Sequence, residues 1–90
     1  MATVRLAPVL RASAGGAKQV SAAGSNLNEV LADLYKHYPA LKEQIQPAES
    51  LSRFINVYVN DQDVRYLKGL ETSISPTDTI ILLPAMAGGR

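Results

Sequence analysis

Cysteine and tryptophan are absent from this 90-residue chain, and histidine occurs once. Without cysteine the chain has no disulfide, no thiolate metal site and no cysteine nucleophile. The single histidine, His37, has neither a carboxylate nor a second metal ligand beside it in the sequence. We interpret His37 as a solvated helix end, where a cation suits the helix dipole, and expect no bound metal.

An excess of positive charge is also missing, because nine basic and eight acidic side chains leave a formal net charge of +1. A nucleic-acid partner is therefore not expected, since such binding depends on phosphate neutralisation. No apolar run reaches the roughly 18 residues that span a bilayer, and the start lacks the charged and apolar blocks of a signal peptide. We expect one domain in a soluble cytoplasmic protein with no membrane contact.

The residue sets that carry out catalysis are not found. There is no grouping of nucleophile, base and orienting residue, and no Gly-x-x-x-x-Gly-Lys phosphate loop. Asp61 and Asp63 lie in a polar segment that is typical of a turn, and the ligand spacing of a calcium loop is missing. We predict that the chain has no enzyme activity of its own and binds no cofactor stably.

Strands are predicted where β-forming residues alternate in character between turn signals. The first covers residues 3–10 with an interruption at Pro8, and Gly15 and Gly16 supply the turn that follows it. The remaining strands are expected at 18–22, 54–60, 64–66 and 79–83. The opening is therefore a β-hairpin with a loose turn.

One helix is predicted over residues 27–38, where apolar residues recur at helical spacing. Asn26 and Glu29 have the spacing of a capping box, and Pro39 ends the helix. Residues 40–52 are interpreted as a connecting segment with one short turn. The order strand, strand, helix, strands places one helix across one face of a mixed sheet, which is the α+β, ubiquitin-like β-grasp arrangement with the last strand beside the first.

Strand alternation places four apolar side chains on the face of the sheet that the helix leaves uncovered. These candidate partner-binding residues are Phe54, Tyr58, Ile81 and Leu83. An exposed group of aromatic and aliphatic side chains often marks a protein interface. The alternative is that the segment 40–52 folds over this face and makes it ordinary core.

The last six residues, 85–90, read as a flexible tail after a domain of residues 1–84. Gly88 and Gly89 lose much backbone entropy on ordering and bring no side chain to bury, so they do not serve stability. They form a thin strand that could enter a narrow active site, and we interpret this end as a substrate of another protein. The alternative is a frayed end without function.

Three segments together resemble a known family: RFINVYVND at 53–61, DVR at 63–65 and LLPAMAGG at 82–89. They are similar to the ubiquitin-like sulfur carriers of the ThiS/MoaD family, and most of all to its cysteine-biosynthesis branch. The resemblance implies that a ThiF/MoeB-like enzyme uses ATP to adenylate the terminal glycine. It further implies conversion to a thiocarboxylate and transfer of the sulfur to a synthase for cysteine, thiazole or a thiosugar.

On this resemblance the tail residues Ala85, Met86 and Ala87 lead to Gly88 and Gly89, which carry the sulfur. Arg90 departs from the family pattern, in which the second glycine is terminal. We expect that Arg90 is removed before activation, by a peptidase such as a metallopeptidase, or that it is foreign to the natural chain. A carboxyl on this long charged residue should not fit a channel shaped for glycine.

Two further functions stay open at this stage. One is the small subunit of molybdopterin synthase, which shares the tail chemistry but delivers sulfur to a different acceptor. The other is a ubiquitin-like modifier whose diglycine is joined to lysines of target proteins. In each case we expect a chain that is a monomer when alone and that acts through its partners.

Overall fold

Five strands form one mixed sheet in the computed structural model, which describes residues 1–48 and 50–84. The spatial order of the strands is β2-β1-β5-β3-β4. Their bounds are Ala2–Leu6 (β1), Gln19–Ala22 (β2), Ile55–Val59 (β3), Gln62–Asp63 (β4) and Thr79–Pro84 (β5). The first and last strands are parallel neighbours in the middle of the sheet, as predicted.

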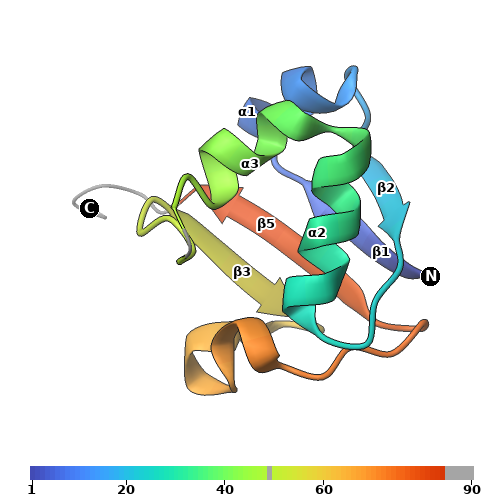
Figure 1. The fold of residues 1–90 in the computed structure, drawn as a ribbon, viewed down its shortest axis with the longest axis vertical. Helices are drawn as coiled ribbons and strands as arrows, with labels where there is room; N and C mark the ends of the chain where they lie inside the picture. Colours follow the sequence, from blue (N-terminus) through green and yellow to red (C-terminus); the bar gives the residue numbers. More distant parts are fainter. Residues whose placement is uncertain (49, 85–90) are drawn as a thin grey trace.

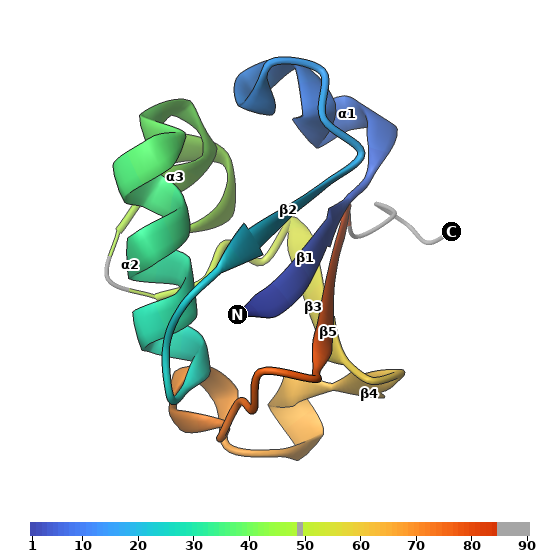
Figure 2. The same cartoon turned by 90° about the vertical axis from the view of Figure 1, so that its right-hand side faces the viewer.

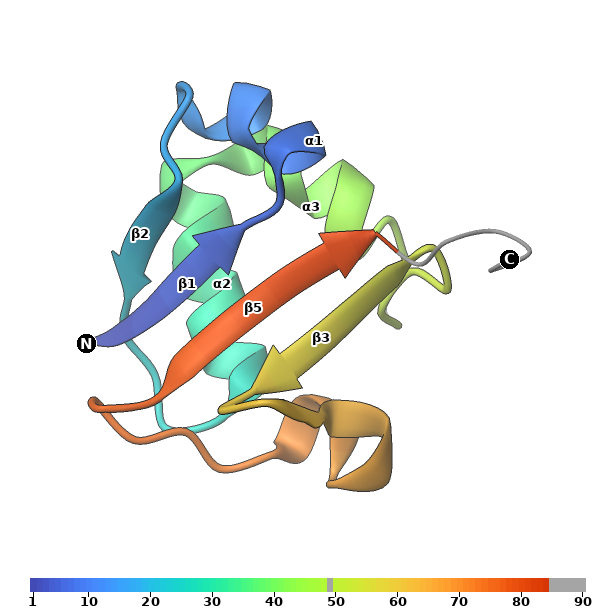
Figure 3. The same cartoon turned by 180° about the vertical axis from the view of Figure 1, so that it is seen from behind.

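The sheet is mixed because only one of its pairings is parallel. The β1–β2 hairpin and the β3–β5 and β3–β4 pairs are antiparallel, whereas β1 and β5 run in the same direction. Seen from behind in Figure 3, β2, β1, β5 and β3 lie side by side with helix α2 beyond them. This arrangement confirms the predicted β-grasp class, and it holds β5 between two hydrogen-bonded neighbours.

Helix α2 spans Leu27–His37 and crosses one face of the sheet (Figure 1). Leu27, Val30, Leu31 and Leu34 are buried, which is the apolar stripe that the sequence predicts. The Asn26 side chain accepts a hydrogen bond from the Glu29 backbone N–H at 2.8 Å. The Glu29 carboxylate accepts from the N–H of Ser25 at 2.7 Å, so this cap reaches one residue further back than a standard capping box.

Two helices were not expected, and a proline begins each of them. α1 spans Pro8–Arg11 and continues into a short 3₁₀ helix, η1, at Ala12–Ala14. α3 spans Pro39–Ile45. The prediction that the first strand extends to residue 10 is therefore wrong, and the segment 40–52 holds more helix than one turn. Proline suits the first helical position because its fixed φ is already helical and its missing N–H has no partner there.

The predicted strand at 64–66 is also wrong, because these residues form a 3₁₀ helix, η2, at Val64–Tyr66. The fourth strand is instead the two-residue β4, which pairs Gln62 with Val59. The carboxylate of Asp63 accepts a hydrogen bond from the backbone N–H of Arg65 at 2.9 Å. This local bond offers the backbone an alternative to the sheet ladder, so the chain turns away. A third 3₁₀ helix, η3, follows at Gly69–Glu71.

The sheet has one covered and one open face, which Figure 2 shows edge-on. Both α2 and α3 lie on the covered side, where α3 packs against α2 and η1. Leu41 and Ile45 of α3 are buried there. The alternative in which this segment covers the opposite face is therefore wrong for α3. Among residues 1–48 and 50–84, no helix has the length and apolar character needed to span a bilayer.

Candidate docking face and the root of the tail

Tyr58, Ile81 and Leu83 lie together on the open face of the sheet. Tyr58 is the register partner of Ile81 across β3 and β5, and Leu83 lies two positions further along β5. Their neighbours Val57, Ile80 and Leu82 point to the covered face and are buried. Leu83 keeps 39% of its surface exposed. We call Tyr58, Ile81 and Leu83 the sheet-face patch.

Phe54, the fourth residue predicted for this surface, lies just before β3 and is 61% exposed. The guanidinium of Arg53 lies 5.4 Å from the centre of its ring, a cation–π contact. The strand pairing begins one residue later, with Ile55 opposite Pro84. Phe54 therefore lies at the border of the sheet-face patch, and its role in partner binding stays a prediction.

The patch lies where β5 ends. Pro84 is the last residue of β5 and its pairing with Ile55 closes the β3–β5 ladder. The predicted sulfur-carrying glycines Gly88 and Gly89 lie outside the described residues, as do 85–87 and Arg90. Residues 85–90 follow Pro84 directly in the sequence. Pro84 ends β5, a central strand that is hydrogen-bonded to β1 on one side and to β3 on the other.

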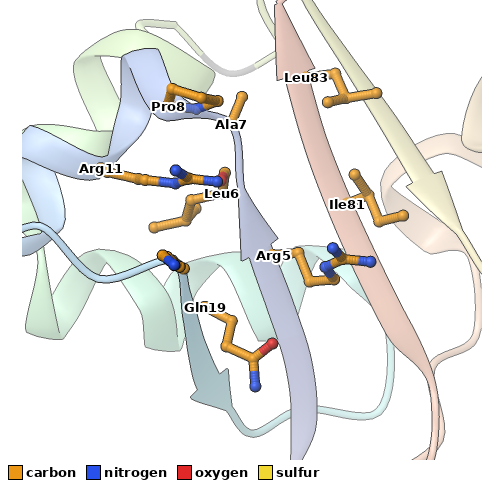
Figure 4. Close-up of a pocket in the computed structure, with 9 residues that line it drawn as sticks. Arg5, Leu6, Ala7, Pro8, Arg11, Gln19, Ile81 and Leu83 are labelled. Atoms are coloured by element: carbon orange, nitrogen blue, oxygen red, sulfur yellow. The ribbon is translucent and has the colours of Figure 1, made fainter.

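A group of basic residues beside the patch was missed by the sequence reasoning. Arg5, Arg11 and Lys18 line a depression of about 320 Å³ together with Ile81 and Leu83 (Figure 4). Arg5 is the register partner of Ile81 across β1 and β5. The signal was present in the sequence, because Arg5 alternates with Val4 and Leu6 and so belongs to the open face.

The other titratable residues considered in the sequence make local contacts. The Nδ1 atom of His37 lies 3.0 Å from the carbonyl oxygen of Asp33 one helical turn earlier. Asp63 forms an ion pair with Arg65 at 2.7 Å, and the side-chain hydrogen bond from Arg65 lowers the pKa of Asp63. Within residues 1–48 and 50–84 no three histidine, cysteine or carboxylate side chains gather as metal ligands would.

A sequence model of the ThiS family matches residues 4–89, which include both glycines of the diglycine pair. This chain belongs to the ThiS family. The family resemblance of segments 53–61, 63–65 and 82–89 is thereby confirmed.

Its relatives in the family include the sulfur carrier protein CysO of Mycobacterium tuberculosis, to which it is 44% identical over 90 residues, covering 97% of both chains. Among solved structures, a chain of the BexX/CysO complex of Amycolatopsis orientalis matches with a TM-score of 0.91 and 43% identity, over 99% of this chain and 100% of that one. The small archaeal modifier protein 1 of Methanosarcina acetivorans matches with a TM-score of 0.84 and 35% identity, over 98% and 95% of the two chains. This ThiS family member is therefore a homologue of the sulfur carrier CysO with the same fold.

Proposed function

We propose that this chain is a sulfur carrier whose Gly89 carboxyl, once Arg90 is removed, is converted to a thiocarboxylate and donates its sulfur to a biosynthetic enzyme. One observation carries the proposal: the family match runs to Gly89, so it includes the diglycine and stops before Arg90. The nearly full-length likeness to a sulfur carrier supports it.

The proposed chemistry needs an activated carboxyl, because a carboxylate is a poor electrophile. In the first step the Gly89 carboxylate attacks the α-phosphorus of ATP, which forms the acyl adenylate and releases pyrophosphate. Sulfide or a persulfide then attacks the acyl carbon and AMP leaves; with a persulfide, reductive cleavage of the S–S bond by a thiol completes the step. Activation divides one difficult substitution into two easier ones. The product carries sulfur on a backbone carboxyl, which a chain without cysteine requires.

Under this proposal the catalytic groups, the ATP and its magnesium belong to partner enzymes. The chain supplies a folded body that docks and a backbone segment that reaches the reaction centre. We assign the docking of a ThiF/MoeB-like adenylating enzyme to the sheet-face patch with Phe54 at its border. Phe54 and Leu83 are exposed and Tyr58 and Ile81 are half-buried, on the open face near the end of β5. The complex of CysO with BexX supports a carrier that acts through another protein.

The proposed acceptor is a cysteine synthase, with a thiazole or thiosugar synthase as alternatives. Support for the first comes from the 44% identity to CysO. A second candidate function is a protein modifier whose diglycine is joined to lysine side chains. The likeness to small archaeal modifier protein 1, at 35% identity, is the observation that favours it.

The proposal is tested with two versions of the chain, one ending at Gly89 and one at Arg90. Each is incubated with ATP, sulfide and the adenylating enzyme, and its intact mass is measured. We expect the shorter version alone to gain the mass of one oxygen-to-sulfur exchange, and we expect a metallopeptidase to make the longer one competent. Sulfur on Arg90 would contradict the steric argument. Conjugates to lysine, cleaved by an isopeptidase, would favour the modifier function instead.

A further inference from the structure

The depression beside the sheet-face patch is positively charged on its walls. Arg5 lies on β1, Arg11 ends α1 and Lys18 precedes β2, so three separate segments bring a cation to one place. We call Arg5, Arg11 and Lys18 the basic rim. No ion pair to another described residue neutralises any of the three, since the one salt bridge within residues 1–48 and 50–84 joins Arg65 to Asp63.

Arg11 is held in position rather than extended into solvent. Its Nε donates a hydrogen bond to the carbonyl oxygen of Leu6 at 3.1 Å, and the side chain is half-buried. Figure 4 shows its guanidinium lying across the end of β1 beside Leu6. The Nε bond leaves the two terminal nitrogens of the guanidinium as donors for a ligand, in the fork geometry that suits a carboxylate.

The remaining lining of the depression is largely apolar. Besides the basic rim it consists of Leu6, Ala7, Pro8, Gln19, Ile81 and Leu83. Arg5 and Ile81 extend side by side from neighbouring strands in Figure 4. None of the nine described lining residues is acidic, and none is aromatic. A ligand that fits must therefore offer negative charge and an aliphatic surface. The nine lining residues provide no aromatic ring on which a nucleobase could stack.

No unpaired acidic side chain offsets the basic rim at the described strand positions of the open face. Its outward positions on β1, β2, β3 and β5 are Thr3, Arg5, Gln19, Ser21, Asn56, Tyr58, Thr79, Ile81 and Leu83. Arg5 is the one charged residue among these described positions. At the edge of the sheet Asp63 lies opposite Tyr58, but its carboxylate is paired with Arg65. A chain with a net charge of only +1 thus presents a locally cationic face.

We propose that this depression binds an acidic segment of the partner enzyme, whose carboxylates pair with the basic rim while an aliphatic side chain packs on Ile81 and Leu83. The inference rests on the proposed function only in taking the partner to be the adenylating enzyme. Charge complementarity selects the occupant, because the rim supplies cations and the floor supplies apolar surface. Leu83 directly precedes Pro84, the last residue of β5. An enzyme bound at this depression would therefore contact the domain next to the point where residues 85–89 begin.

The first test uses a synthetic probe and the full chain labelled for NMR. The probe is the capped peptide Asp-Glu-Leu-Asp-Glu-Ile-Asp-Glu, and its control has Asn and Gln in place of every acid. We expect the acidic peptide to shift the backbone amides of Arg5, Gln19 and Ile81, and its affinity to fall as salt is added. Equal shifts from the neutral peptide, or no shifts at these residues, would overturn the proposal. Inorganic phosphate that shifts the same amides as strongly would overturn it in favour of a simple anion site.

The second test measures Kd for the adenylating enzyme with the variant Arg5→Glu/Lys18→Glu. The matched control, Lys36→Glu/Lys42→Glu, makes the same change of net charge on the helices of the covered side. We expect the first variant to bind about tenfold more weakly and the control to bind as the parent does. Equal Kd values for both variants would refute the proposal that an acidic segment of the enzyme binds the basic rim.

The two hypotheses can fail separately. Sulfur gain at Gly89 is measured on the parent chain and on the same charge variants, all shortened to end at Gly89, with the enzyme at saturating concentration. Gain by the parent chain with no effect of the rim variant on Kd leaves the carrier function standing and overturns the acidic segment. Binding of the acidic peptide to the basic rim in a chain that never gains sulfur supports the binding site and overturns the carrier function.

Discussion

Tyr58 and Ile81 face each other across β3 and β5, on the side of the sheet that no helix covers. The pair unites two segments more than twenty positions apart in sequence, and only the antiparallel register of β3 with β5 brings them together. Arg5 extends the same row from β1 as the partner of Ile81. An aromatic, an aliphatic and a cationic side chain thus follow one another across three strands, close to the end of β5.

Replacing Tyr58 with serine should weaken binding to the adenylating enzyme. An aromatic anchor at the centre of an interface contributes about 2 kcal/mol, which is about thirtyfold in Kd. Serine is preferred to aspartate because Tyr58 lies opposite Asp63, where a second carboxylate would add repulsion. The measurement is Kd by titration calorimetry. Tyr66→Ser is the control, since Tyr66 is 85% exposed on η2 and is not part of the sheet-face patch, and its loss should leave Kd unchanged. Equal losses in both variants would argue against docking at the patch.

Leu82 and Leu83 are adjacent on β5 but serve opposite faces, so their alanine variants should separate stability from binding. Leu82 is fully buried, and Leu82→Ala should cost about 3 kcal/mol and lower Tm by about 12 °C or more. Leu83→Ala should cost much less stability, because this side chain is 39% exposed, and should instead weaken enzyme binding. Thermal unfolding and calorimetric binding of both variants check this. A similar fall in Tm for the two would contradict the assignment of faces.

The fold was predictable where one pattern decided it. The stripe of Leu27, Val30, Leu31 and Leu34 identified α2 to within a residue at its end, and the alternation around Val57 identified β3. The sequence did not predict α1 and α3, because a proline can both end one element and begin a helix. Pro8 predicts a break in a strand and Pro39 the end of a helix. α2 does end before Pro39, but each proline is also the first residue of another helix.

The candidate site was predictable only in its apolar part. Strand parity identified Tyr58, Ile81 and Leu83, because alternation is a local property of each strand. The basic rim could not be derived from parity alone, since Arg11 and Lys18 lie outside the strands and reach the depression through α1 and the turn at Gly15 and Gly16. Both glycines adopt the positive φ that the sequence predicts, at 65° and 86°.

Gly24 should not tolerate a side chain, although it is exposed. A Cβ atom added there would lie 2.5 Å from the backbone nitrogen of Val30 and 2.8 Å from atoms of Glu29. The first turn of α2 would have to shift, so Gly24→Ala should cost about 1–3 kcal/mol in unfolding free energy. Urea unfolding measures the loss. Ala23→Gly is the neighbouring control on the same loop, and it should cost less than Gly24→Ala. A Gly24→Ala variant as stable as the parent would show that the loop and helix can separate without loss.

Asp78 should make the stability of the domain depend on acid pH. The backbone N–H of Ser75 and the side-chain amide of Asn60 donate hydrogen bonds to its carboxylate, and they lower its pKa from the ordinary value of 3.8. Because the folded pKa lies below the unfolded one, this stabilisation is complete above about pH 4 and is lost as the pH falls through the folded value. Hydrogen bonding from Arg65 also lowers the pKa of Asp63. The contributions of the two carboxylates to the pH dependence of stability therefore add.

Asp78→Asn should therefore lower the unfolding free energy at neutral pH and make it fall less steeply as the pH drops below 3.8. Urea unfolding at a series of pH values between neutral and strongly acid measures the slope. Asp61→Asn is the matched control, because it removes one carboxylate from the neighbouring turn, where Asp61 has a φ of 74° that asparagine also adopts. If the slope of the Asp78 variant equals that of the parent, the hydrogen bonds from Ser75 and Asn60 do not favour the charged carboxylate. Asp63→Asn is then the next variant to measure, because the hydrogen bond from Arg65 lowers the pKa of Asp63 in the same direction.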